Sequence, residues 1–210
     1  ILSNDTKYEN IKTLKRNLKK LKYEQRQLSK KQKDSKSRKK QRKKLAIVHE
    51  KISNIRKDYL HKVSTEIIKN HDIICVEDLA VKNIMKNHKL AQAMSDVSLG
   101  MFYTMLEYKA SWNDKKIIKI DRFFPSSKQC NNCGFINQNL KLDYREWVCT
   151  SCKSKLDRDL NASKNILKEG IKISLGTNDY RRGDEIRPVL TGMIGEAFRE
   201  KVISHWKNTN

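Results

Sequence analysis

The first ninety-nine residues of this 210-residue chain contain neither glycine nor proline, and this absence constrains the fold more than any other feature. Glycine and proline are the strongest local breakers of a helix, so we expect long helices before Gly100. Apolar residues recur at helical spacing from Leu14 to Leu28 and again from Leu45 to Val63. The charged, serine-rich segment 30–40 between them predicts a turn, so the two helices should form an antiparallel hairpin at about residues 10–70.

The charge of the chain is strongly one-sided. Forty-six Lys and Arg residues against 24 Asp and Glu residues give a formal net charge of +22, which points to a polyanionic partner such as DNA, RNA or an anionic membrane surface. A membrane is the weaker option, because no apolar run of about 18 residues and no export leader is present, and a cytoplasmic location is therefore expected.

The basic residues of the hairpin have two interpretations. Charge runs are commonly solvated helix faces, but such faces usually alternate Glu with Lys, and here the carboxylates are too sparse to compensate the repulsion. Bound phosphates would compensate it. On that second interpretation, the candidate nucleic-acid contacts near the turn are Lys36, Arg38, Lys39, Lys40, Arg42 and Lys43.

An α/β unit follows the hairpin. Residues 73–76 are a short apolar run rich in β-branched side chains, which predicts a central strand buried on both faces, with Cys75 as a small buried hydrophobe. Residues 97–112 predict a helix, and residues 117–120 predict a second strand.

Four of the five cysteines form two C-x-x-C pairs, Cys130 with Cys133 and Cys149 with Cys152. Fifteen residues separate the pairs, which is the spacing of a structural tetrathiolate zinc site. Unrelated or disulfide-linked cysteines are the alternative, and both the paired spacing and the lack of an export signal favour the metal. Four thiolates leave no open coordination position, so the expected zinc ion stabilises the fold and does not activate water.

Two acidic residues stand where a catalytic metal site could form. Glu77 ends the first predicted strand, and Asp159 precedes a helical pattern expected to close at Gly170. Carboxylates at such positions can share Mg²⁺, although Glu77 could equally be a solvated strand end and Asp159 a helix N-cap. A two-metal site needs further acids, and spacing does not choose among Asp121, Asp78 and Asp157.

Three segments, 76–79, 121–134 and 157–162, together resemble the TnpB/OrfB family of insertion-sequence proteins, long described as transposases. The resemblance runs from about the first residue to about residue 200. It implies an RNase H-like (RuvC) α/β core that is incomplete at its N-terminus, with the helical hairpin and a zinc ribbon as insertions. The implied divisions are a core segment at 1–124, the ribbon at 125–156, the last RuvC helix at 157–170 and a C-terminal tail at 171–210.

The resemblance also implies roles for the acids. Glu77 and Asp159 match the family's second and third catalytic residues, whereas the first acid lies on an upstream strand that this chain lacks, so activity of the chain itself is an open question. Family members are RNA-guided DNA endonucleases, which implies a guide RNA, a DNA target, catalytic Mg²⁺ and structural Zn²⁺ in a prokaryotic cytoplasm. A non-catalytic nucleic-acid-binding remnant is the alternative function, and a ribosomal-type zinc ribbon is a third that leaves the carboxylate-bearing strands unexplained.

Overall fold

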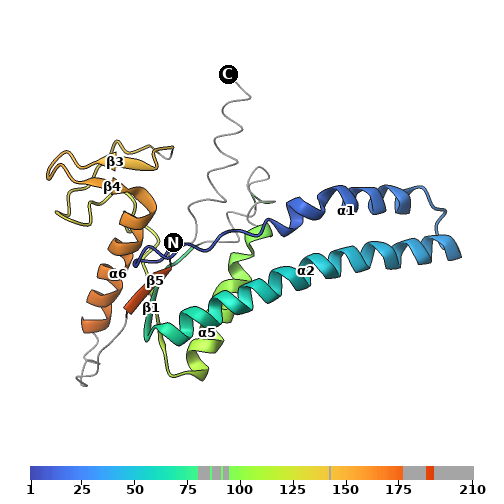
Figure 1. The fold of residues 1–210 in the computed structure, drawn as a ribbon, viewed down its shortest axis with the longest axis horizontal. Helices are drawn as coiled ribbons and strands as arrows, with labels where there is room; N and C mark the ends of the chain where they lie inside the picture. The colour runs from blue at the N-terminus through green and yellow to red at the C-terminus, as the bar shows by residue number, and fades with distance from the viewer. Residues whose placement is uncertain (80–85, 87–90, 92–94, 142, 177–187, 192–210) are drawn as a thin grey trace.

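The computed structural model of the chain describes residues 1–79, 86, 91, 95–141, 143–176 and 188–191 (Figure 1). It combines a long helical hairpin, a small parallel sheet covered by helices, and a short two-stranded module. Among these residues, no helix has the length and apolar content needed to cross a bilayer.

Helices α1 (Thr13–Ser29) and α2 (Lys36–Asn70) lie antiparallel in the predicted hairpin (Figure 1). The turn is shorter than expected, because α2 already begins at Lys36. Ser35 caps that helix, and its Oγ accepts a hydrogen bond from the Arg38 backbone nitrogen at 3.1 Å. The basic residues predicted for the turn after residue 35 therefore belong to the first turns of α2.

Side chains hold the tip of the hairpin in place. The Arg38 guanidinium donates to the carbonyl oxygens of Lys31 at 2.9 Å and Leu28 at 3.2 Å, at and just beyond the end of α1. The buried Gln41 amide donates to both the backbone carbonyl and the carboxylate of Glu24, at 3.1 Å and 2.6 Å. Direct contacts between the two helices thus define the hairpin geometry.

The start of α1 is fixed by a residue far along the chain. Lys12, which precedes the helix, makes no side-chain cap. The carboxylate of Asp96 supplies the cap instead, accepting from the backbone nitrogens of Leu14 at 2.9 Å and Lys15 at 3.4 Å. Arg56 on α2 pairs with the same carboxylate at 3.4 Å, so Asp96 joins both helices of the hairpin to the segment before α5.

The sheet has the order β2-β1-β5, and all three strands are parallel. Strand β1 (Ile73–Glu77) is central, β2 (Lys116–Ile120) pairs with it in the register Glu77 to Ile120, and β5 (Pro188–Thr191) lies on its other side. Helix α5 (Leu99–Trp112) connects β1 to β2. The predicted strand-helix-strand unit is confirmed, and β5 shows that part of the predicted tail belongs to the sheet.

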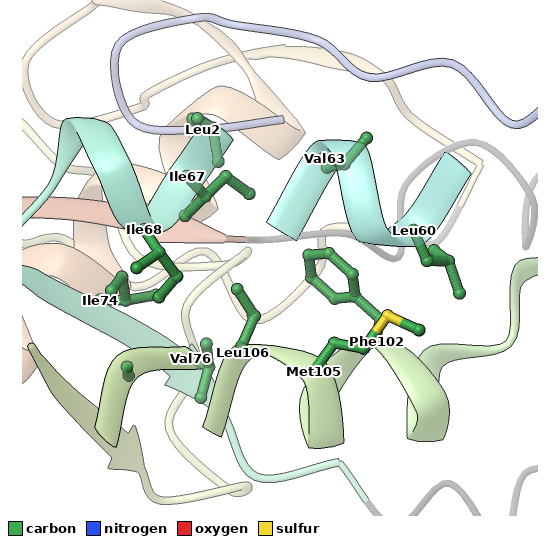
Figure 2. Packing of buried hydrophobic residues seen from close by; sticks show 11 residues of the cluster. Leu2, Leu60, Val63, Ile67, Ile68, Ile74, Val76, Phe102, Met105 and Leu106 are labelled. Carbon is green, nitrogen blue, oxygen red and sulfur yellow. The ribbon is translucent and has the colours of Figure 1, made fainter. Parts of the chain in front are cut away.

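One face of the sheet is covered by α2 and α5 (Figure 2). Side chains from the two helices, including Ile67, Phe102 and Leu106, meet Ile74 and Val76 of β1 and are nearly inaccessible to water. Leu2 also enters this cluster, which places the beginning of the chain against the same core. This packing holds the strand that ends at Glu77.

The other face of β1 packs against α6 (Arg158–Gly176), whose Ile166 joins Ile73, Cys75 and Ile120 in a second cluster. Burial raises the pKa of Cys75 to about 12, in agreement with its predicted role as an inert hydrophobe. The prediction that this helix closes at Gly170 is wrong. Gly170 is an interior helical position that lies directly over Cys75 and lets α6 approach the strand closely.

Candidate functional site

The four predicted cysteines converge on one point. Their sulfur atoms all lie within 4.8 Å of one another, with Cys130 Sγ 3.7 Å from Cys152 Sγ and Cys133 Sγ 3.6 Å from Cys149 Sγ. A tetrahedral zinc ion with Zn–S bonds of about 2.3 Å places its sulfurs about 3.8 Å apart, so this cluster fits such an ion closely.

Backbone hydrogen bonds shape the two cysteine turns. In the first, Gly134 N donates to Cys130 O at 2.9 Å, with Gly134 at φ 80, a conformation that favours glycine. The second turn has the same hydrogen bond, from Lys153 N to Cys149 O at 2.9 Å, and Lys153 adopts φ 61. The turns sit on a small core that includes Trp147 of β3 (Glu146–Val148) and Leu156 of β4 (Lys155–Asp157), which pair antiparallel.

The thiols of Cys130 and Cys152 have unequal acidity. Burial raises the pKa of Cys130 to about 11, whereas hydrogen bonds with Ser154 lower the pKa of Cys152 to about 6. A metal ion would have to displace protons chiefly from the buried side of the cluster.

Glu77 lies at the carboxyl end of the central strand, half-buried. Its Oε1 accepts a hydrogen bond from Ser126 Oγ at 3.0 Å, and its backbone carbonyl lies 3.5 Å from the Tyr103 hydroxyl. Desolvation raises the pKa of the Glu77 carboxyl group, and the hydrogen bond from Ser126 acts in the opposite direction. The interpretation of Glu77 as a freely solvated strand end is therefore wrong.

Asp159 occupies the first turn of α6, but it is not the cap of that helix. Asp157 is the cap, because its Oδ1 accepts from the backbone nitrogens of Asp159 at 2.9 Å and Leu160 at 2.8 Å. Asp159 instead lines a cavity of about 70 Å³, together with Ile1, Asp96 and the first turn of α5. Capping of α6 is thus the role of Asp157 and not of Asp159.

The three other acids considered from sequence each have a local structural contact. Asp157 caps α6, as described. Asp121 accepts a hydrogen bond from Phe123 N at 2.6 Å, which closes a tight turn after β2. Asp78 is paired with the Arg122 guanidinium, whose Nε lies 3.1 Å from Asp78 Oδ2.

Sequence reasoning assigned no role to Ser126, although it lies within the segment 121–134 singled out for its resemblance. Its carbonyl oxygen and that of Gln129 both accept hydrogen bonds from the Asn165 side chain of α6, at 2.8 Å and 2.6 Å. Asn161, one turn earlier, donates to the same Gln129 oxygen at 2.6 Å and accepts from Asn131 N at 2.8 Å. These two asparagines connect the helix of Asp159 to the segment that carries both Ser126 and Cys130.

The predicted nucleic-acid contacts lie along the first two turns of α2. Five of them are exposed, whereas Arg38 is occupied by its hydrogen bonds across the hairpin tip. No acidic residue stands in the first turn of this helix, so its positive end carries only cations. The exposed residues are Lys36, Lys39, Lys40, Arg42 and Lys43.

Two family models match the two segments of the chain that carry the candidate site residues. Residues 2–88, which include Glu77, match the OrfB/IS605 family model described as "Probable transposase". Residues 100–166, which include the four cysteines and Asp159, match the model described as "Cas12f1-like, TNB domain". The chain belongs to the TnpB/OrfB family.

Curated TnpB/OrfB relatives support the assignment along almost the whole chain. A "Putative RNA-guided DNA endonuclease" from Streptomyces pristinaespiralis is 44% identical over 147 residues, covering 70% of this chain and 35% of the relative. The "Putative RNA-guided DNA endonuclease InsQ" of Escherichia coli K12 is 34% identical over 208 residues, covering 92% of this chain and 52% of InsQ. The chain thus spans about a third to a half of the length of these relatives.

Two solved structures share the fold of much of this chain. A cryo-EM structure titled "CRISPR-Cas12f Ternary Complex" aligns with a TM-score of 0.51 and 24% identity over 73% of this chain and 32% of that chain. A "Cas12f1-sgRNA-target DNA complex" aligns with a TM-score of 0.50 and 23% identity, covering 73% of this chain and 41% of that chain. At these identities the likeness concerns the arrangement of helices and strands.

Proposed function

We propose that this chain is the RuvC-like catalytic part of an RNA-guided DNA endonuclease, with Glu77 and Asp159 as ligands of catalytic Mg²⁺. The observation that carries the proposal is the Glu77 carboxylate, which is desolvated at the carboxyl end of a central parallel strand and oriented by Ser126. Open α/β sheets assemble their sites at this edge. The curated relatives described as RNA-guided DNA endonucleases point to the same activity.

The surroundings of the two acids support a shared site. Phe102 lines the same cavity as Asp159, and the hydroxyl of the next residue, Tyr103, lies near the Glu77 carbonyl. Asp159 thus lies near α5 through the cavity that it lines, and Glu77 lies near the same helix through its backbone carbonyl. Helix α6, which carries Asp159, packs directly against β1, which carries Glu77.

Partial burial makes Glu77 a costly anion unless a cation accompanies it. A divalent metal would offset that cost, and oxygen ligands from separate elements are what Mg²⁺ accepts. When bound, the metal would supply Lewis-acid activation of a scissile phosphate and of a water molecule. The contribution of Ser126 is to hold one Glu77 oxygen in place.

The four cysteines would hold a structural Zn²⁺. The zinc site lies next to the segment that contacts Glu77, which gives a closed metal site a role in a nuclease. Its first cysteine, Cys130, follows Ser126 by four residues, and the side chains of Asn161 and Asn165 bind the backbone between them to α6. We infer that zinc keeps Ser126, and through it Glu77, in register with the helix of Asp159.

Nucleic acid would bind along the exposed cations at the start of α2. Cations at the positive end of a helix repel both the helix dipole and one another, and a phosphate backbone would relieve this repulsion. DNA and a guide RNA both offer phosphates to these cations. We expect the protein to encounter both in the cytoplasm.

The test is Mg²⁺-dependent cleavage of target DNA by the protein extended upstream of Ile1 with the strand expected to carry the first acid, in the presence of its guide RNA. Glu77→Gln and Asp159→Asn should each reduce the cleavage rate by about 100-fold or more, because a catalytic metal contributes several kcal/mol. Glu107→Gln serves as the control and should leave the rate unchanged, since Glu107 is an exposed acid of α5 that pairs with Lys119. Cleavage that survives Glu77→Gln would refute the catalytic assignment and favour a non-catalytic nucleic-acid-binding protein.

A further inference from the structure

We propose that Phe123 is a stacking platform for an unpaired nucleobase of the strand that passes Glu77. The inference rests on the proposed nuclease function and extends it, because it assigns a base-binding residue beside the cutting site. The phenyl ring of Phe123 would carry the base, and its position would set which nucleotide lies next to Glu77.

The first observation is exposure. Phe123 is 86% exposed, more than any other large hydrophobic side chain in the described residues. Its neighbour Phe124 is packed against the cluster formed by β1, β2 and α6. The chain thus buries one ring of the pair and leaves the other in water.

The second observation is that Phe123 stands on a fixed turn. Its backbone nitrogen donates to Asp121 Oδ1 at 2.6 Å, and Phe124 N donates to Asp121 O at 3.2 Å. Ser126 N donates to Phe124 O at 2.7 Å, which continues the turn toward the Glu77 contact. An aromatic ring held by such a turn loses little further freedom when it binds a flat partner.

The third observation is proximity to Glu77. The segment 121–125 is held at both ends against that residue, because Ile120 is paired with Glu77 in the sheet and Ser126 donates to the Glu77 carboxylate. The three residues from Phe123 to Ser126 span at most about 10 Å. The ring is therefore close enough to Glu77 for one strand of nucleic acid to contact both.

The net charge of the chain favours a polyanionic occupant. A charge of +22 favours a polyanion over an apolar protein partner, and Arg122, the residue before Phe123, stays partly exposed although it pairs with Asp78. Nucleobases offer flat faces to aromatic rings whatever their sequence, but a duplex keeps those faces covered by neighbouring base pairs. A single exposed phenyl ring therefore fits a strand that has already been separated from its complement.

The test measures binding of the full chain to a short single-stranded DNA carrying 2-aminopurine, by fluorescence anisotropy and by quenching of the 2-aminopurine emission. Phe123→Leu should weaken binding by about 5-fold or more, the lower end of the effect of losing one base stack. Phe123→Trp should restore both affinity and quenching. Trp112→Leu is the matched control: Trp112 is 76% exposed at the end of α5, and this change should leave binding unaltered.

A strand of abasic sites separates stacking from simple contact. It should bind the unaltered chain and Phe123→Leu equally well, and a duplex should bind both proteins equally. An equal loss on abasic and normal strands, or no loss on either, would overturn the stacking role, as would failure of the unaltered chain to bind single strands. These measurements need no cleavage. If the protein extended upstream of Ile1 never cuts DNA while the Phe123 effect persists, the nuclease proposal is refuted and the stacking site stands.

Discussion

Replacement of Gly170 by alanine tests the contact that joins the helix of Asp159 to the strand of Glu77. An alanine Cβ at this position would lie 2.3 Å from Cys75 Sγ and 2.7 Å from Cys75 Cβ, far inside van der Waals contact. Both elements are buried there, so α6 must move away from β1. Overpacking of a core costs about 1–3 kcal/mol, and a gap this short places Gly170→Ala near the upper end. The gain from replacing a helical glycine is about 1 kcal/mol, which leaves a net loss of about 1–2 kcal/mol.

Urea unfolding monitored by circular dichroism measures this loss as a lower midpoint at an unchanged slope. Gly100→Ala is the control, because a Cβ there has no neighbour within 4 Å, and the change should stabilise the chain by about 0.4–1 kcal/mol. Cys75→Gly combined with Gly170→Ala removes both clashing atoms and should recover part of the loss. A Gly170→Ala protein as stable as the unaltered chain would show that α6 does not approach β1 this closely.

Three further outcomes follow from the site. Cys149→Ser should abolish binding of one equivalent of zinc, measured by competition with a chromogenic chelator, whereas Cys75→Ala should retain it; zinc retained by the first variant would refute the tetrathiolate site. Glu77→Gln should raise the urea midpoint at pH 7 in magnesium-free buffer. Burial raises the pKa of Glu77 above 4.5, so its contribution to stability falls as pH rises beyond that value, and at pH 4 the variant and the unaltered chain should match. The exposed cations at the start of α2 are Lys36, Lys39, Lys40, Arg42 and Lys43, and changing one that contacts a phosphate to glutamine should lower the log-log salt slope for duplex DNA by about 0.9. Arg38→Gln should chiefly destabilise the hairpin. Slopes that stay unchanged would show that these five cations do not contact DNA.

The sequence identified the elements whose signals are local. Long helices follow from the absence of glycine and proline before Gly100, and the buried strand at residues 73–76 follows from an unbroken apolar run. The cysteine cluster could also be predicted from the sequence, because each C-x-x-C pair forms its own turn. Only the approach of the two turns to each other depends on the tertiary fold.

Capping and close packing were decided by tertiary contacts. Asp96 caps a helix 82 residues earlier, and no local pattern marks it for that role. Gly170 resembled a helix end because glycine favours such ends, but contact with Cys75 explains it in the interior of α6. In the same way, Asp157 caps the helix for which the sequence had offered Asp159 as the cap.

Part of the candidate site could be predicted from the sequence, and part depends on tertiary contacts. Residue type and position made Glu77 and Asp159 candidates, and the resemblance to the TnpB/OrfB family gave them their roles, which stay predictions. The partner of Glu77 could not be predicted, because the hydroxyl of Ser126 reaches it across 49 positions of the chain. Spacing along the backbone encodes what neighbouring residues can form together, whereas the desolvation and hydrogen bonding of Glu77 depend on helices and turns that only the folded chain brings against it.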